Sequence, residues 1–318
     1  MTAPASTCQT IVVGFDGSAP ATAALDWAAN AAKRTGATLR IISVVHYPGM
    51  PAGTVELVPV LPASLLKRAH DLAANAAVHA REVLGAARVE TQIVIGAAAE
   101  ALVTAAESVQ LLVVGNRGRS ELGSTVLGSV SFAVVAHAHC PVIVVRQGAV
   151  ALGPENGVVV GVDGSSAGDR ALDMAADVAD HAGAPLRIIS AWDLPAADSW
   201  AFSYWETAPV DTDWARTQHE VAVKVAAAAA DRAQSQHPGL VTTNEVQQGP
   251  AGAALIGASH HAGLVVVGSR GLGGFAGLVL GSVSHNVIHG CVCPAMVVRK
   301  STSNRPETAR ADVMMVGS

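Results

Sequence analysis

The chain has 318 residues, of which 50% are hydrophobic and 14% are charged, so it can bury the cores of two domains of ordinary size. Its 20 Lys and Arg residues against 25 Asp and Glu residues give a net charge of −5, and only 3% of residues are aromatic. This composition excludes the basic, base-stacking surface of a nucleic-acid-binding protein and a surface that binds anionic membranes.

No apolar run reaches the roughly 18 residues that a membrane span needs, and residues 1–9 do not have the pattern of a signal peptide. We therefore expect a cytoplasmic protein that does not associate with membranes. Four cysteines are few for a disulfide scaffold, and we expect them to be free thiols.

The first half of the chain alternates strand patterns with helix patterns. Strands are expected at Thr10–Phe15, Thr38–Val45, Val89–Ile95, Leu111–Val114 and Val142–Val145, with helices over about 19–35, 63–84, 98–107 and 129–137. Continuous Val, Ile and Leu in the strands indicates burial on both faces, and helices between strands indicate parallel pairing. We therefore predict a doubly wound, Rossmann-like α/β domain, with a five-stranded parallel sheet and helices on both faces.

The second half repeats this order. Gly157–Ser165 restates Ile11–Ser18, and the later strands recur at Pro185–Ala191, Val241–Val246, Leu264–Val267 and Ala295–Val298. We predict two tandem domains over residues 1–147 and 157–300, a linker over 148–156, and a disordered tail over 301–318.

A glycine-rich segment follows the fourth strand of each half. The spacing G-x2-G-x9-G-S occurs at Gly115, Gly118, Gly128 and Ser129, and again at Gly268, Gly271, Gly281 and Ser282. Glycines let the backbone approach a ligand closely, and a helix start offers unpaired amides and positive dipole charge. One such loop is more typical of a turn, but two copies at a constant offset favour a phosphate site.

An aspartate follows the first strand of each half, in the pattern G-x-D-G-S. In a doubly wound sheet the ligand crevice lies outside the carboxyl ends of strands one and four, so Asp16 and Asp163 are expected beside the glycine loops. Each could be a helix N-cap, an acceptor for ribose hydroxyls, or a ligand of phosphate-bound Mg²⁺, directly or through water. Arg117 and Arg270 lie where a guanidinium could reach phosphates or remain solvated.

Two motifs of nucleotide-binding enzymes do not occur in the sequence. It lacks G-x4-G-K-[ST], and it lacks G-x-G-x-x-G after the first strands. We therefore predict no catalytic residues. Histidines and cysteines gather near strand five, but their spacings differ between the halves, which argues against zinc; they are His137, His139, Cys140, His285, His289, Cys291 and Cys293.

Taken together, these features resemble the tandem, ATP-binding members of the universal stress protein family, over about residues 9–300. The motif G-2x-G-9x-G-[ST] carries the resemblance, which implies adenine contacts near Val45 and from Ala191 to Asp193, and a role for Asp16 and Asp163. The expected nucleotide-binding residues are Gly14, Asp16, Val45, Gly115, Asn116, Arg117, Gly118, Arg119, Gly128, Ser129 and Val130 in the first half, and Gly161, Asp163, Ala191, Asp193, Gly268, Ser269, Arg270, Gly271, Leu272, Gly273, Gly274, Gly281, Ser282 and Val283 in the second.

The resemblance implies a regulatory module in which ATP, with Mg²⁺, acts in stress adaptation or growth control, at two sites per chain and with an unidentified protein partner. The alternative is an enzyme of slow ATP hydrolysis or adenylyl transfer, as some relatives of this fold perform. The lack of a positioned base or catalytic lysine favours the first. Arg119-Ser-Glu121 stands opposite Leu272-Gly-Gly274, so the two sites are not expected to have equal affinity.

Strand five of each half is a short apolar edge, and such edges seldom stay bare. We predict that Val142–Val145 and Ala295–Val298 pair across a pseudo-two-fold axis within one chain. A homodimer of whole chains is a further expectation, because two-fold pairing is the commonest oligomeric arrangement.

Overall fold

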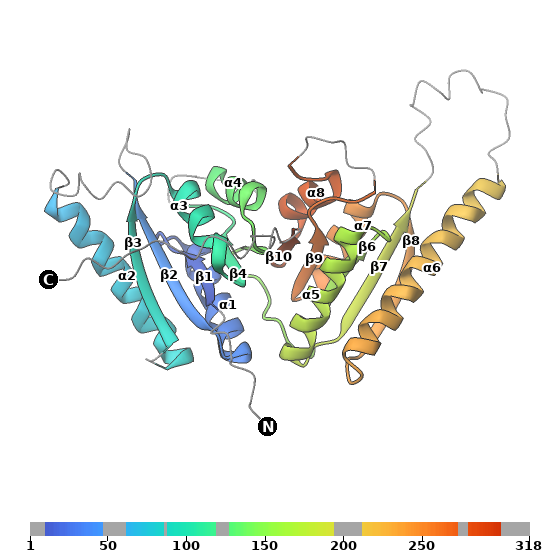
Figure 1. The fold of residues 1–318 in the computed structure, drawn as a ribbon, viewed down its shortest axis with the longest axis horizontal. Coiled ribbons are helices and arrows are strands. Elements are labelled where there is room, and N and C mark those ends of the chain that lie inside the picture. Colours follow the sequence, from blue (N-terminus) through green and yellow to red (C-terminus); the bar gives the residue numbers. More distant parts are fainter. Residues whose placement is uncertain are drawn as a thin grey trace, which may run out of the picture.

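The structure is a computed structural model that describes residues 10–46, 62–85, 88–118, 127–193, 212–272 and 279–299 (Figure 1). The strands are β1 (Thr10–Gly14), β2 (Thr38–Val45), β3 (Val89–Ile95), β4 (Leu111–Gly115), β5 (Val142–Val145), β6 (Val158–Val162), β7 (Leu186–Trp192), β8 (Thr242–Gln248), β9 (Leu264–Gly268) and β10 (Ala295–Val298). The helices are α1 (Ala19–Thr35), α2 (Ala63–Leu84), α3 (Ala98–Ala105), α4 (Ser129–His137), α5 (Ser166–Ala182), α6 (Thr212–Gln236), α7 (Ala251–Ala258) and α8 (Ser282–Gly290).

These strands form one sheet in the order β3-β2-β1-β4-β5-β10-β9-β6-β7-β8. Within each half all pairs are parallel, and strand one lies between strands two and four, which confirms the doubly wound topology. At the centre β5 and β10 pair antiparallel, with Ile143 opposite Met296. The predicted pairing of the two fifth strands is therefore confirmed, and it merges two five-stranded sheets into one.

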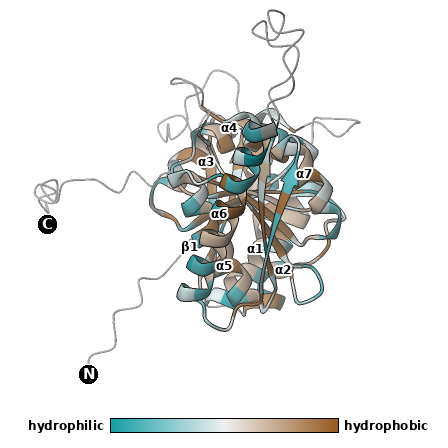
Figure 2. Cartoon of the chain, turned by 90° about the vertical axis from the view of Figure 1, so that its right-hand side faces the viewer, coloured by the Kyte–Doolittle hydropathy of each residue, from teal (hydrophilic) through white to brown (hydrophobic). Residues whose placement is uncertain are grey.

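Helices cover both faces of the sheet. Alternate residues of β1 belong to different cores, since Ile11 and Val13 pack towards α1 and α2 whereas Val12 packs towards α3 and α4. Figure 2 shows the hydrophobic residues gathered between the helical layers, with hydrophilic residues on outward-facing helix surfaces. The sheet is thus buried on both faces, as its unbroken apolar strands predict.

The contact between the halves extends beyond the paired strands. Arg146, which directly follows β5, donates hydrogen bonds of 2.8 Å to the carbonyl oxygens of Ile288 and His289 in the last turn of α8. A guanidinium at a helix C-terminus satisfies exposed carbonyls and complements the helix dipole. The first half therefore anchors a helix of the second half.

Capping residues explain the bounds of α1 and α5. Ser18 Oγ accepts a hydrogen bond of 3.3 Å from the Ala21 amide, and Ser165 Oγ accepts one of 3.0 Å from the Gly168 amide. Gly36, in the left-handed region at φ 74°, ends α1. The serines, rather than Asp16 and Asp163, are the N-caps, so the capping interpretation of the aspartates is wrong.

Three cysteines, Cys140, Cys291 and Cys293, are buried and free, as expected, and Cys8 lies outside the described residues. Burial raises the pKa of Cys140 and Cys293 to about 12 and that of Cys291 to about 11. These thiols are therefore packing groups rather than reactive thiolates.

No helix in the described part of the chain has both the length and the apolar character needed to cross a membrane. The proposed boundaries at 147 and 157 remain predictions, and the tail over 301–318 lies outside the described residues.

Candidate functional site

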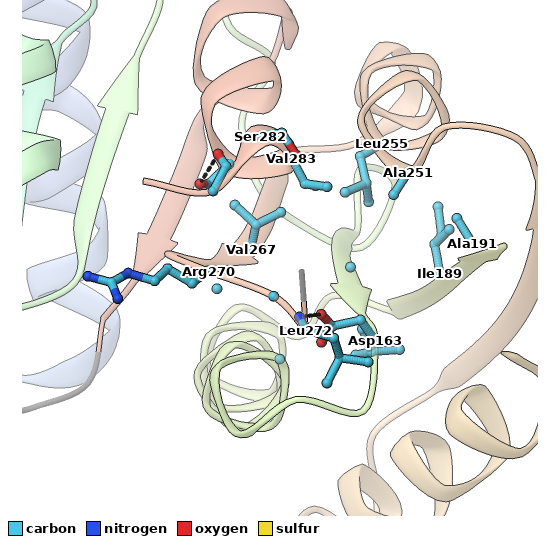
Figure 3. A pocket seen from close by; sticks show the side chains of 17 residues that line it. Asp163, Ile189, Ala191, Ala251, Leu255, Val267, Arg270, Leu272, Ser282 and Val283 are labelled. Carbon is cyan, nitrogen blue, oxygen red and sulfur yellow. Dashed lines mark hydrogen bonds between the residues drawn. The ribbon is translucent and has the colours of Figure 1, made fainter. Parts of the chain in front are cut away.

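Each half has a crevice at the carboxyl end of its first and fourth strands. In the second half this crevice is a cavity of about 450 Å³ where β6 lies between β7 and β9 (Figure 3). The crossovers leave β6 in opposite directions at this point, which is the topological switch point of the sheet. The predicted position of the site therefore coincides with a real cavity.

The glycine loop of the second half is closed at its base by backbone hydrogen bonds. The Gly281 amide donates to Ser269 O at 2.8 Å, and the Ser269 amide donates to Val298 O at 2.8 Å. Ser284 Oγ also donates to Ser269 O, at 3.1 Å. The two ends of the loop are thus joined directly to each other and to β10.

The same pattern recurs in the first half. There the Gly128 amide donates to Asn116 O at 2.8 Å, and the Asn116 amide donates to Val145 O at 2.8 Å. Asn116 and Ser269 therefore close the loops through their carbonyls, and neither is among the described residues that line the two crevices.

The N-terminus of α8 opens onto the second cavity. Gly281 is the N-cap residue and offers no side-chain cap, while Ser282, Val283 and Ser284 line the cavity. The first amides of the helix lack intrahelical partners and carry the positive end of its dipole. This end of the cavity suits an anion.

Asp163 connects the two loops that border the second cavity. Its Oδ1 accepts a hydrogen bond of 3.0 Å from the Ser165 amide, and its Oδ2 accepts one of 3.0 Å from the Leu272 amide (Figure 3). In the first half, Asp16 Oδ1 accepts the equivalent bond from the Ser18 amide at 2.9 Å. Each aspartate therefore shapes its crevice, and each also lines it.

Three of the motif glycines, Gly115, Gly268 and Gly271, are required by packing within the protein. A Cβ on Gly268 would lie 2.8 Å from the carbonyl carbon of Ala167, and one on Gly115 would lie 2.7 Å from that of Pro20. A Cβ on Gly271 would overlap the Asp163 carboxylate. These positions let strand, helix and loop backbones meet closely, a role that the sequence reading did not assign to them.

The opposite end of the second cavity is apolar. Ile189 and Ala191 of β7 and Ala251 and Leu255 of α7 form this wall (Figure 3). Apart from Ala191 they were not predicted, because α7 reads in the sequence only as a short apolar helix. Apolar residues at one end and open amides at the other suit a ligand with a flat apolar group and a negative charge.

Most of the predicted binding residues do line the cavities. The lining includes Gly14, Asp16, Gly115, Arg117, Gly118, Gly128, Ser129 and Val130 in the first half, and Gly161, Asp163, Ala191, Gly268, Arg270, Gly271, Leu272, Gly281, Ser282 and Val283 in the second. Arg119, Gly273 and Gly274 lie outside the described residues.

Val45 and Asp193 do not line a cavity. In the first half Val44 does so instead, because neighbouring residues of a strand point to opposite faces of the sheet. Arg270 lines the second cavity, but Figure 3 shows its side chain extending away from the apolar wall and out of the cavity. Arg299 donates a hydrogen bond of 2.7 Å to Val279 O, near the end of the second glycine loop, and its pKa is lowered by burial and then by Arg270.

Comparison with known proteins assigns both halves to one family. The sequence model of the universal stress protein family matches residues 7–146 and 156–299. A universal stress protein of Mycobacterium tuberculosis is 35% identical over 206 residues, which are 64% of this chain and 66% of that protein. One from Mycolicibacterium smegmatis is 34% identical over 206 residues, 63% and 65% of the two chains. The alignment thus spans just under two thirds of these relatives' length.

Solved structures share the tandem fold. A universal stress protein from Archaeoglobus fulgidus aligns with 92% of this chain and 97% of its own, at 20% identity and a TM-score of 0.61. One from Pseudomonas aeruginosa covers 93% and 94%, at 15% identity and a TM-score of 0.60. A universal stress protein in complex with cAMP aligns with 44% of this chain at 30% identity and a TM-score of 0.36, and covers 97% of that chain.

Proposed function

The chain belongs to the universal stress protein family, and we propose that it is a regulatory module that binds ATP at the switch-point crevice. One observation carries the proposal: the second cavity joins an apolar wall to an uncapped helix N-terminus. Its volume of about 450 Å³ falls within the range of about 300–1,000 Å³ typical of small-molecule sites. This volume, with an apolar wall at one end and helix amides at the other, suits an adenine nucleotide.

In this arrangement the adenine ring lies against Ile189, Ala191 and Leu255, which offer apolar surface and no competing charge. The phosphates lie at the start of α8 and along the backbone of Gly271, where amides and the helix dipole neutralise negative charge. The ribose lies between these ends, within reach of Asp163.

Mg²⁺ is compatible with this site as a companion of the phosphates. In proteins it is held by one or two carboxylates together with phosphate oxygens and water. Asp163 is the carboxylate in the lining of the second cavity, and no group of three or more potential metal ligands occurs among the described residues. Mg²⁺ bound there would depend on the phosphates for its remaining ligands and would offset their charge.

The lining favours retention of ATP over its turnover. Asp163 and Arg270 are the titratable side chains among the described residues that line the second cavity. Both oxygens of Asp163 already accept amide hydrogen bonds, and the Arg270 side chain points out of the cavity. Neither is placed as a general base towards an attacking water. Slow hydrolysis or adenylyl transfer is therefore the alternative function.

The experiment is to strip the full-length protein of nucleotide, add ATP labelled at the γ-phosphate with Mg²⁺, and follow label that is retained or released. We expect retained, chemically unchanged ATP over the course of a single-turnover assay. Release of labelled phosphate, or transfer of an adenylyl group, would favour the enzymatic alternative. Absence of retained nucleotide at saturating ATP would contradict the proposal itself.

The homodimer of whole chains, the regulatory protein partner and the cytoplasmic location remain predictions. Analytical ultracentrifugation with and without ATP tests the first of them.

A further inference from the structure

We propose that a third cavity, walled by the linker between the two halves, is a binding site for a small organic anion with an apolar body. This linker cavity lies between α1 and residues 148–152, and Val145 of β5 also lines it. Its volume is about 350 Å³, which falls within the range of about 300–1,000 Å³ typical of small-molecule sites. The inference is independent of nucleotide binding.

The linker cavity is separate from both crevices. None of its lining residues lines a crevice. Trp27 and Leu152, which line it, pack against the core on the α1 and α5 face of the sheet. Leu102 and Leu255, which line the crevices, belong to the core on the opposite face. A ligand in the linker cavity therefore does not compete for space with a nucleotide.

The linker wall is held in place by backbone contacts. The linker descends between α1 and α5 (Figure 1). Gly153 and Asn156 exchange backbone hydrogen bonds of 3.3 and 3.1 Å. Leu152 packs closely against Gly263, where a Cβ would lie 2.7 Å from the Leu152 Cα. The cavity is therefore formed before a ligand binds, at a junction between domains, where small-molecule sites are common.

Arg34 supplies the charge of the linker cavity. It lines the cavity, is half-buried, and has no hydrogen-bond or ion-pair partner within the described part of the chain. Burial lowers its pKa. A desolvated guanidinium without a partner is costly, and its planar fork matches the oxygens of a carboxylate or phosphate. An anion in the cavity would provide the missing partner.

The neighbouring charges do not take up this role. Arg88, which packs at the same end of α1, donates hydrogen bonds to Ala32 O at 3.4 Å and to Leu84 O at 3.3 Å. It therefore satisfies helix carbonyls, which Arg34 does not. The carboxylate in the lining, that of Asp26, already pairs with His79 of α2. Arg34 also favours the dipole at the end of α1, but that role alone would leave ligand binding independent of it.

The rest of the lining defines the body of the ligand. Trp27 contributes its ring, and because its Nε1 is buried, the ring offers the cavity apolar surface rather than a donor. Val150 and Leu152 add aliphatic surface from the linker. A carboxylate carried on a compact aromatic or aliphatic group fits this combination of one cation and apolar walls.

The second half does not repeat the residues that make this site. Helices α1 and α5 both have 17 residues, but Met174 and His181 stand where Trp27 and Arg34 stand in the first half. The ring and the guanidinium are therefore particular to the first half, unlike the duplicated glycine loops.

The test is saturation-transfer NMR on the full-length protein, with phenylacetate and hexanoate as probes and phenylacetamide as the neutral match of the first. We expect at least one of the two acids to bind with a Kd below about 1 mM, and phenylacetamide to bind at least about tenfold more weakly than phenylacetate. Saturating ATP should not displace either acid.

Arg34→Gln should reduce the affinity for the acid by about tenfold or more. Lys33→Gln is the matched control, because it removes an exposed charge from the neighbouring position, which does not line the cavity. Ala149→Leu, which fills the cavity from the linker, should also weaken binding, and it decides the matter should Arg34→Gln not fold. Melting temperatures show whether each variant is folded.

Four results would overturn the inference. They are no binding of either acid at about 10 mM, equal binding of phenylacetate and phenylacetamide, displacement of the acid by ATP, and unchanged affinity in a folded Arg34→Gln variant. The nucleotide proposal stands or falls separately, because its labelled-ATP assay does not involve this cavity.

Discussion

The carboxylate of Asp163 accepts a hydrogen bond of 3.0 Å from the backbone amide of Leu272, a residue 109 positions later in the chain. This single contact ties the loop after β6 to the loop after β9, the two segments that border the second crevice. Since Oδ1 of the same carboxylate accepts the Ser165 amide, the side chain is fixed at both oxygens. The aspartate therefore fixes the backbone at Leu272, at the start of the glycine loop, before any ligand arrives.

Replacement of Asp163 should accordingly weaken nucleotide binding more than it weakens the fold. In Asp163→Ala both amide contacts are lost, while the buried core is untouched, so we expect a fall in melting temperature of only a few degrees, corresponding to about 1–2 kcal/mol. ATP affinity should fall by about tenfold or more because the loop is no longer held. Titration calorimetry and thermal unfolding measure the two effects. Equal affinity in a folded variant would show that the aspartate does not organise the site.

A side chain at Gly271 should disrupt the same contact from the other side. A Cβ there would overlap Asp163 Oδ2, so Gly271→Val displaces the carboxylate and should abolish binding at the second crevice. Because Gly271 is exposed, the fold should survive. Gly257→Ala is the control, since a Cβ at that helical position has no neighbour within 4 Å. If a folded Gly271→Val variant bound ATP with the affinity of the parent, the glycine loop would not be part of the nucleotide site.

A charge placed between the paired strands β5 and β10, where the two halves meet, should destabilise the whole molecule. Val144 is fully buried on β5 and pairs in register with Ala295 of β10. Val144→Lys places an unpaired ammonium group between the halves, which should cost about 3–5 kcal/mol of unfolding free energy. We expect a much lower denaturation midpoint and unfolding in two steps, one for each half. Val78→Lys, at an exposed position on α2, should unfold like the parent. An unchanged midpoint for Val144→Lys would contradict the continuous sheet.

The contact between Arg146 of the first half and the end of α8 in the second should also make stability depend on pH. Burial, followed by the nearby charges of His285 and Arg146, lowers the pKa of His289 below its ordinary value of 6.5. The unfolded chain then binds a proton at a pH where the folded chain does not. The contribution of His289 to the free energy of unfolding is therefore complete above about pH 6.5, and it is lost as the pH falls through the lowered pKa.

Melting temperature should therefore fall between about pH 7.5 and about pH 5.5, and His289→Ala should reduce that fall. Alanine is a conservative choice, because Ala136 stands at the equivalent position of α4. Differential scanning calorimetry of both proteins across this range measures the difference in slope. Identical slopes would mean that His289 remains as easily protonated in the folded protein as in the unfolded chain.

Much of the fold could be predicted because local signals agree with one another. The bounds of α1 follow from the N-cap Ser18 and the C-cap Gly36, which stand on either side of an apolar stripe in the sequence. The pairing of β5 with β10 was predictable as well, since two short apolar strands at sheet edges require partners. Strand ends were less certain: β7 continues to Trp192 and β8 to Gln248, because pairing with a neighbour extends a strand beyond its own apolar residues.

The candidate site was predictable only at its phosphate end. The glycine spacing marks the loop, but the reason for Gly268 is its contact with the backbone of α5, which no local pattern records. The apolar wall depends on which face of β7 meets α7, so Leu255 carries no signal of its own.

The most direct test of nucleotide binding at the second crevice is photolabelling of the stripped, full-length protein with an azido-adenine analogue of ATP, followed by peptide mapping. We predict labelled peptides from the apolar wall, around Ile189 to Trp192 and Ala251 to Leu255, and loss of the label in the presence of excess ATP. The Gly271→Val variant should not be labelled there. Labelling that ATP does not compete, or a complete absence of label from the second crevice, would contradict nucleotide binding at this site.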